Sequence, residues 1–123
     1  MESYKNVTEI VLSYIKALDN GEYDAAAGYL SDDVRIIGPA GESFRKPGEF
    51  IDMLRQHRGR YNLKKTFTDE KDVCLLYDLI TPAVTVFVCS WYKAWEGKIV
   101  TIRSVFDPQA FSPKPTKKSD GTE

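Results

Sequence analysis

The chain has 123 residues and a formal net charge of −1, and 42% of its residues are hydrophobic. This length allows one domain with one core, and so small a net charge provides no long-range field for nucleic acid or an anionic membrane. No apolar run reaches the roughly 18–20 residues of a membrane helix. The N-terminal stretch also lacks the apolar segment of a secretory signal. We therefore expect a cytoplasmic protein that binds neither nucleic acid nor a membrane.

The N-terminal segment has the period of α-helices. Apolar residues from Val7 to Leu18 recur at steps of three and four, which places them on one stripe of a helix. Asn20-Gly21 is predicted to end this helix, because glycine tolerates the left-handed conformation of a helix stop. A shorter second helix follows, and its inner stripe is predicted to consist of Tyr23, Ala26, Ala27 and Leu30.

A short strand and a third helix are expected next. The strand is predicted over Val34–Ile37, after the polar run Ser31–Asp33 breaks the helical pattern, and the turn Gly38–Gly41 ends it. Pro47 is suited to the first turn of the third helix. The buried side of that helix is predicted to consist of Phe50, Met53, Leu54 and His57.

From Tyr61 onward the period changes to two, which is typical of half-buried strands. Tyr61, Leu63 and Phe67 are predicted to share the buried face of the first of these strands. Three further strands are expected at Val73–Ile80, Ala83–Trp95 and Ile99–Asp107.

Residues 1–111 are predicted to form the single domain, and 112–123 a disordered C-terminal tail. The tail contains two prolines and almost no apolar residues, so it cannot bury enough surface to offset the entropy of ordering.

One face of the long Ala83–Trp95 strand indicates self-association. Its large aromatic residues alternate with the positions expected to face the core, so they must point away from it. A soluble monomer rarely exposes such an apolar patch. We therefore predict a homodimer through the outer sheet face, with Phe87, Trp91 and Trp95 in the contact.

The predicted element order is helix, helix, strand, helix and four strands. Three segments at matching spacing, YIKALDNGEYDAAAGYLSDDV, the GPAG turn and EGKIVTIRSVFDP, make the chain resemble the nuclear transport factor 2-like superfamily, in its SnoaL-like and ketosteroid isomerase-like branch. The resemblance covers about residues 4–111. It implies an α+β cone, in which a curved antiparallel sheet wraps around three helices. This fold hosts many unrelated activities.

The isomerase branch can be compared residue by residue. In ketosteroid isomerases a tyrosine of the first helix donates a hydrogen bond to the substrate carbonyl, and Tyr14 matches that position. The resemblance places Gly38 where those enzymes have their carboxylate base, and Ser90 where they have a second, protonated carboxylate. Proton transfer between carbons needs a base within hydrogen-bond reach. We therefore do not expect ketosteroid isomerase activity.

The epoxide hydrolase branch activates water with an Asp-Arg-Asp arrangement, and Asp78, Arg103 and Asp107 supply these residue types. Strand parity places Asp78 and Arg103 on the outer face of the sheet, which favours an ion pair between them over a catalytic role.

The resemblance also implies a site inside the cone. Tyr14 and His57 are the candidate catalytic residues, although a structural role near a helix end is the default for His57. Cys74 and Cys89 have no CxxC spacing and are predicted to be reduced, buried thiols. With one histidine and no cluster at ligand spacing, no metal or cofactor is predicted. The candidate ligand-binding residues are Gly38, Tyr77, Ser90, Tyr92, Ser104 and Phe106.

Two hypotheses follow for the function. The first is a small-molecule-binding protein or enzyme whose apolar pocket holds a small apolar organic ligand bearing oxygen. The sequence leaves open whether it catalyses a reaction, which would be of isomerase, cyclase or hydratase/lyase type without a metal. The second is a non-catalytic dimerisation or association module whose cone is filled by its own side chains.

Overall fold

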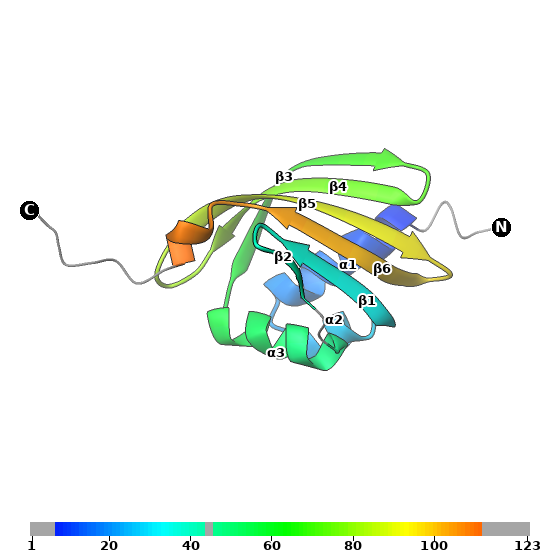
Figure 1. The fold of residues 1–123 in the computed structure, drawn as a ribbon, viewed down its shortest axis with the longest axis horizontal. Helices are drawn as coiled ribbons and strands as arrows, with labels where there is room; N and C mark the ends of the chain where they lie inside the picture. Colours follow the sequence, from blue (N-terminus) through cyan, green and yellow to red (C-terminus); the bar gives the residue numbers. More distant parts are fainter. Residues whose placement is uncertain (1–6, 44–45, 112–123) are drawn as a thin grey trace, which may run out of the picture.

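The structure is a computed structural model that describes residues 7–43 and 46–111. The predicted disordered tail, 112–123, lies outside the described residues. The observed elements are α1 (Val7–Asp19), α2 (Tyr23–Ala27), β1 (Leu30–Gly38), β2 (Gly41–Ser43), α3 (Pro47–His57), β3 (Arg60–Asp69), β4 (Asp72–Ile80), β5 (Thr85–Trp95), β6 (Lys98–Val105) and the 3-10 turn η1 (Pro108–Phe111) (Figure 1).

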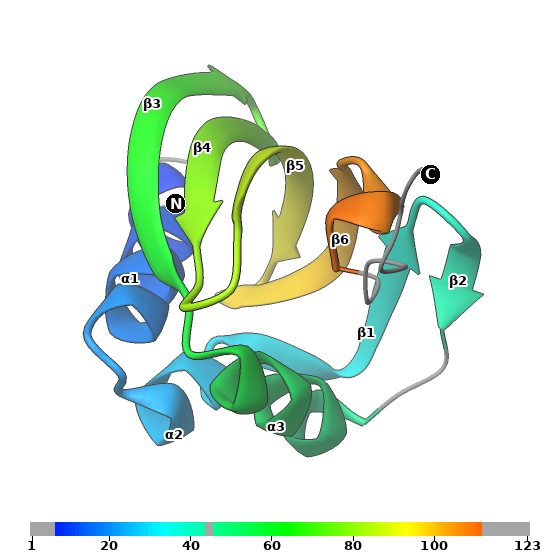
Figure 2. The same ribbon diagram turned by 90° about the vertical axis from the view of Figure 1, so that its left-hand side faces the viewer.

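The six strands form one curved sheet in the order β2-β1-β6-β5-β4-β3. The sheet curls around the helical layer, with α1 and α3 on its concave side (Figure 2). The predicted α+β cone is thereby confirmed. One detail was wrong: the sheet is mixed, because β1 pairs with β6 in the parallel direction. None of the described helices is long and apolar enough to cross a membrane.

Helix α1 forms as its apolar stripe predicts. Val11, Tyr14 and Leu18 lie on the buried face and pack against the sheet. The helix ends because Gly21 adopts a positive φ of 75°, a left-handed conformation that glycine reaches without a Cβ clash.

Strand β1 is longer than predicted, and β2 was not predicted. The polar run Ser31–Asp33 belongs to β1, where the pairing with β6 is irregular between Leu30 and Arg35. Polar residues are tolerated here because, at an irregularity, they are not part of a regular hydrogen-bonded ladder between buried strands. Strand β2 has three residues and is defined by its pairing with β1, so it is too short to leave a period in the sequence.

Strand β3 departs from simple alternation. Leu63 lies opposite Tyr77, but the pairing register shifts between Leu63 and Lys65. Such a bulge adds one residue, so side chains beyond it exchange faces. Phe67 therefore lies on the outer face and is 53% exposed, and the prediction that Tyr61, Leu63 and Phe67 share one buried face was wrong.

The buried side of α3 also differs from the prediction. Phe50 is buried, as expected, but Ile51 is the most buried residue of the helix. Met53 and Leu54 are half-buried and His57 is exposed. The reason is that α3 packs against both α2 and β1. Its buried residues therefore do not lie on the single stripe that contact with one neighbour would produce.

The two faces of β5 alternate as predicted. Val86, Val88, Ser90, Tyr92 and Ala94 are buried inside the cone. The residues between them point outward, and the exposed ones are Thr85, Phe87, Trp91, Lys93 and Trp95.

Candidate ligand-binding site

A cavity of about 430 Å³ lies inside the cone, between the concave sheet face, α1, α3, the β1–β2 turn and η1. This volume is in the range of small-molecule pockets. The predicted site residues that line it are Tyr14, Gly38, His57, Tyr77, Tyr92, Ser104 and Phe106. This cavity favours the first of the two hypotheses over a cone filled by its own side chains.

Tyr14 projects from the buried stripe of α1 into this cavity and is only 2% exposed. Its ring meets the ring of Tyr92 edge-on, with 6.1 Å between centroids. Burial raises the pKa of Tyr14, so its phenol stays a neutral hydrogen-bond donor. Within residues 7–43 and 46–111, no hydrogen bond joins this hydroxyl to the protein. A buried donor of this kind normally has a partner.

Three hydroxyls form a chain on the opposite wall. Ser90 Oγ lies 3.0 Å from the Tyr77 hydroxyl and 2.8 Å from Ser104 Oγ. Ser90 itself is fully buried and does not line the cavity, whereas Tyr77 and Ser104 do. Because each hydroxyl can donate and accept, the two ends of the chain that line the cavity can serve either role toward a ligand. Burial raises the pKa of Tyr77, so this end of the chain is also neutral.

A fourth tyrosine, Tyr61 on β3, belongs to the site but was not among the predicted site residues. Its ring lies 5.4 Å from that of Tyr77. Its backbone N–H donates to Asp19 at the end of α1, at 2.8 Å, which holds the first residues of β3 against the helix. The inward parity predicted for Tyr61 was the sequence signal that could have assigned it to the site.

His57 lies at the edge of the cavity rather than deep within it. It occupies the last turn of α3, is exposed, and stacks at 5.6 Å on Phe111 of η1. Phe111 in turn packs edge-on against Phe106, at 5.4 Å. These three rings line one wall of the cavity, with His57 at its outer edge.

Gly38 ends β1 beside the cavity. A Cβ built at this position meets no atom within 4 Å, so the position that carries the base in ketosteroid isomerases has room for a side chain and lacks one. Among the residues that the structure describes, the cavity lining contains no Asp, Glu, Lys or Arg.

The residue types of an epoxide hydrolase site do not come together here. Asp78 and Arg103 lie on the outer face, as strand parity predicts. The predicted ion pair between them was wrong: Asp78 Oδ2 lies 3.6 Å from Lys64 Nζ, because the bulge in β3 brings this lysine alongside. Asp107 is exposed and accepts a hydrogen bond from the Gln109 N–H at 3.0 Å.

Comparison with known proteins supports the fold directly. No protein-family model matches the sequence, and no curated protein matches it significantly. An NTF2-like protein of unknown function from Cytophaga hutchinsonii is similar, with 26% identity, a TM-score of 0.78, and coverage of 84% of this chain and 91% of that chain.

Two enzyme-related structures have the same fold. An LEH-like epoxide hydrolase from M. tuberculosis is 20% identical, with a TM-score of 0.71 and coverage of 88% of this chain and 87% of that chain. A putative ketosteroid isomerase from Kribbella flavida is 13% identical, with a TM-score of 0.76 and coverage of 94% and 87%, respectively. The predicted resemblance to the nuclear transport factor 2-like superfamily is thus confirmed, and the chain has that fold.

Proposed function

We propose that the protein binds a small, neutral and largely apolar organic molecule in the cone, and that an oxygen of this molecule accepts a hydrogen bond from Tyr14. The observation that carries the proposal is the Tyr14 hydroxyl, which is buried at the cavity without a protein partner among the described residues. A ligand carbonyl or hydroxyl would satisfy this donor, and water would do so when the ligand is absent.

The lining supports the neutral character of the ligand. Transferring an ion into an apolar site costs far more than transferring a neutral oxygen, unless an opposite charge is present. The described part of the lining provides no such charge, and its polar side chains carry hydroxyls together with one imidazole at the edge. These groups can bind carbonyl, hydroxyl or ether oxygens.

Carbon-to-carbon proton transfer is not part of the proposed function. Gly38 offers no base, and His57 lies at the cavity edge without an orienting carboxylate among the cavity-lining residues. A base must come within hydrogen-bond reach of the proton that it removes. Ligand binding itself is what the arrangement of Tyr14 and the hydroxyl chain supports.

Binding of Nile red, a neutral dye with a carbonyl oxygen, tests the proposal. We expect its fluorescence to rise on binding to the wild type, and Tyr14→Phe to weaken the affinity by about 0.5–1.5 kcal/mol, roughly 2- to 12-fold. Tyr29→Phe, which changes a tyrosine outside the cavity, is the control and should leave the affinity unchanged. Equal affinities for wild type and Tyr14→Phe would contradict the role of Tyr14. Mass spectrometry of natively purified protein then identifies any co-purifying molecule.

A second candidate function, self-association through the outer sheet face, rests on different residues. Phe87, Trp91 and Trp95 are 57%, 45% and 51% exposed, which is unusual for aromatic side chains on one face of a soluble protein. We propose that a second copy of the chain covers them, and the cavity is compatible with this dimer because it lies on the other side of the sheet.

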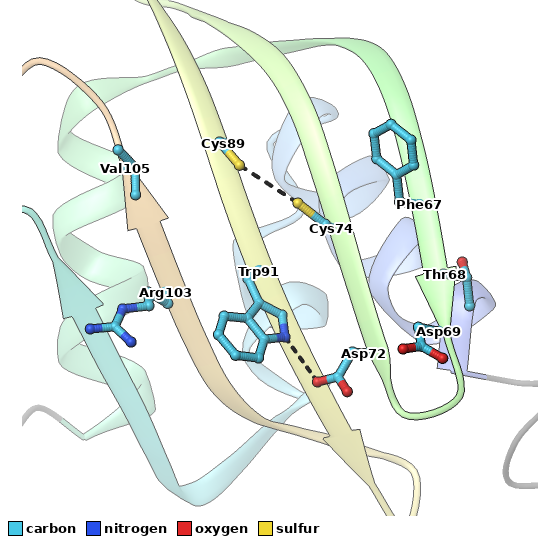
Figure 3. Close-up of a pocket in the computed structure, with 9 residues that line it drawn as sticks. All are labelled: Phe67, Thr68, Asp69, Asp72, Cys74, Cys89, Trp91, Arg103 and Val105. Atoms are coloured by element: carbon cyan, nitrogen blue, oxygen red, sulfur yellow. Dashed lines mark hydrogen bonds between the residues drawn. The ribbon is translucent and has the colours of Figure 1, made fainter.

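Charge placement on this face fits a two-fold dimer. Figure 3 shows Arg103 on one side of Trp91, with Asp72 and Asp69 on the other. In an isologous contact the same patch of both copies is used, so if residue i of one copy meets residue j of the other, then residue j of the first copy meets residue i of the second. A two-fold axis that passes near Trp91 and runs along the strands would place the basic side of each copy against the acidic side of its partner, which favours this orientation.

A further inference from the structure

The two cysteines of the chain have no CxxC spacing in the sequence, yet they come together on the outer sheet face. Cys74 lies on β4 and Cys89 on β5, and their sulfur atoms are 3.6 Å apart (Figure 3). Both are free and half-buried. They line an open groove of about 460 Å³, which also includes Phe67, Trp91 and Val105.

The register of the two strands disfavours a direct disulfide. Cys74 pairs with Trp91 and Cys89 pairs with Leu76, so the cysteines are diagonal neighbours rather than partners. Diagonal Cα atoms in an antiparallel pair are typically about 7–8 Å apart, whereas disulfides join Cα atoms at about 4.4–6.8 Å. Closing an S–S bond would therefore require movement of the central strands of the sheet.

The distance between the two sulfur atoms, in contrast, suits one metal ion bound by both of them. Thiolates bind zinc at about 2.3 Å in tetrahedral geometry, which places two bound sulfurs about 3.8 Å apart. The observed sulfur–sulfur distance of 3.6 Å is close to this value, and small rotations of the two side chains can close the difference. The cysteines thus have the spacing of a bidentate pair without any backbone change.

We propose that Cys74 and Cys89 form a two-thiolate binding site for a thiophilic divalent ion of the zinc group. Asp72 also lines the groove, where its carboxylate accepts a hydrogen bond from the Trp91 indole at 2.8 Å. The two sulfurs are the proposed protein ligands. Within the described part of the chain, no group of three potential ligand residues exists. In a chain with no second copy on this face, the groove leaves the remaining positions to water or to a small external thiol. On binding, each thiol releases its proton to solvent.

Titration of the full-length protein with cadmium chloride, in a buffer reduced by a phosphine rather than a thiol, tests this site. We expect a thiolate-to-cadmium charge-transfer absorption that saturates at one ion per chain. Cys74→Ser and Cys89→Ser should each abolish it, whereas Asp72→Asn, the matched control, should retain it. Retention of the absorption in either serine variant would overturn the proposal, as would its loss in Asp72→Asn.

A measurement on the unchanged protein covers the case in which a variant fails to fold. Iodoacetamide should add to both cysteines without cadmium and to neither with it, as read by the intact mass. Modification of both cysteines despite saturating cadmium would overturn the proposal. The titration is repeated at protein concentrations below and above self-association: one ion per chain at both supports the site, and one ion per two chains would replace it with a bridging site. None of these readouts depends on the cone cavity.

Discussion

The two faces of the β4–β5 pair carry different chemistry on the same backbone. Their inner face holds Leu75, Tyr77 and Ser90, which are buried and build the wall around the cavity. Their outer face holds Cys74 and Trp91, which are at least partly exposed to solvent. Since side chains alternate along a strand, one stretch of sequence specifies both the wall of the cavity and the outer face on which we propose self-association. We expect inner-face residues to contribute mainly to the stability of the fold and outer-face residues mainly to self-association. Substitutions on each face can separate these two contributions.

The largest expected effect comes from truncating the inner face. Leu75 is fully buried opposite Ser90, so Leu75→Ala should destabilise the fold by about 2–5 kcal/mol through lost contacts and the cavity that remains. Leu76, its chain neighbour, points outward and is half-buried. Leu76→Ala should cost about 1 kcal/mol or less. Urea unfolding at low protein concentration gives both values, and equal losses would mean that the faces are not energetically distinct.

The next effect concerns self-association through the outer face. Aromatic residues at the centre of an interface commonly contribute 2 kcal/mol or more, so Trp91→Ala should weaken a dimer by roughly 30-fold or more. Lys93→Ala, at the rim of the same face, should have a much smaller effect. Sedimentation over a range of micromolar concentrations measures both. A wild-type protein that sediments only as a 14.0 kDa species would contradict the dimer.

The alternation of buried and outward-facing side chains could be predicted from the sequence because β4 and β5 keep an unbroken period of two. Val88, Ser90 and Tyr92 were assigned to the inner face on this basis, and they are buried there. The helices of the N-terminal half were predictable for a similar reason, since a stripe of apolar residues and a glycine stop are local signals.

What could not be predicted depends on pairing rather than on period. The bulge near Lys64 adds one residue without changing composition, and it turns Phe67 outward and brings Lys64 to Asp78. The parallel pairing of β1 with β6 joins segments far apart in the chain. Cys74 and Cys89 meet only because of the register of β4 against β5. Each of these features is fixed by which strands are neighbours.

The candidate site was predictable in part. Tyr14 followed from the family resemblance, and Tyr77, Ser90, Tyr92 and Ser104 followed from strand parity combined with that resemblance. The structure brings all of these except Ser90 to the cavity lining, together with Tyr61, which was not among the predicted site residues. Ser90 instead stands behind Tyr77 and Ser104. The position of His57 depended on how α3 packs between α2 and β1, which its sequence alone does not fix.

The smallest expected effect comes from adjacent residues of similar size, Cys89 and Ser90, which point to opposite faces of β5. Ser90→Ala should destabilise the fold by about 1–3 kcal/mol, because it removes the hydroxyl that partners both Tyr77 and Ser104. The loss should fall at the low end of this range, since the two orphaned hydroxyls border the cavity and can bind water.

Cys89→Ala is the matched control for this last substitution. A thiol is a weak hydrogen-bond donor, and Cys89 is half-buried with only the Cys74 sulfur as a side-chain partner among the described residues. We therefore expect Cys89→Ala to cost less than Ser90→Ala in urea unfolding of the reduced, metal-free protein. The reverse order would mean that the paired thiols contribute more to the fold than the inner hydroxyl chain, and that the outer face is not merely a surface for binding.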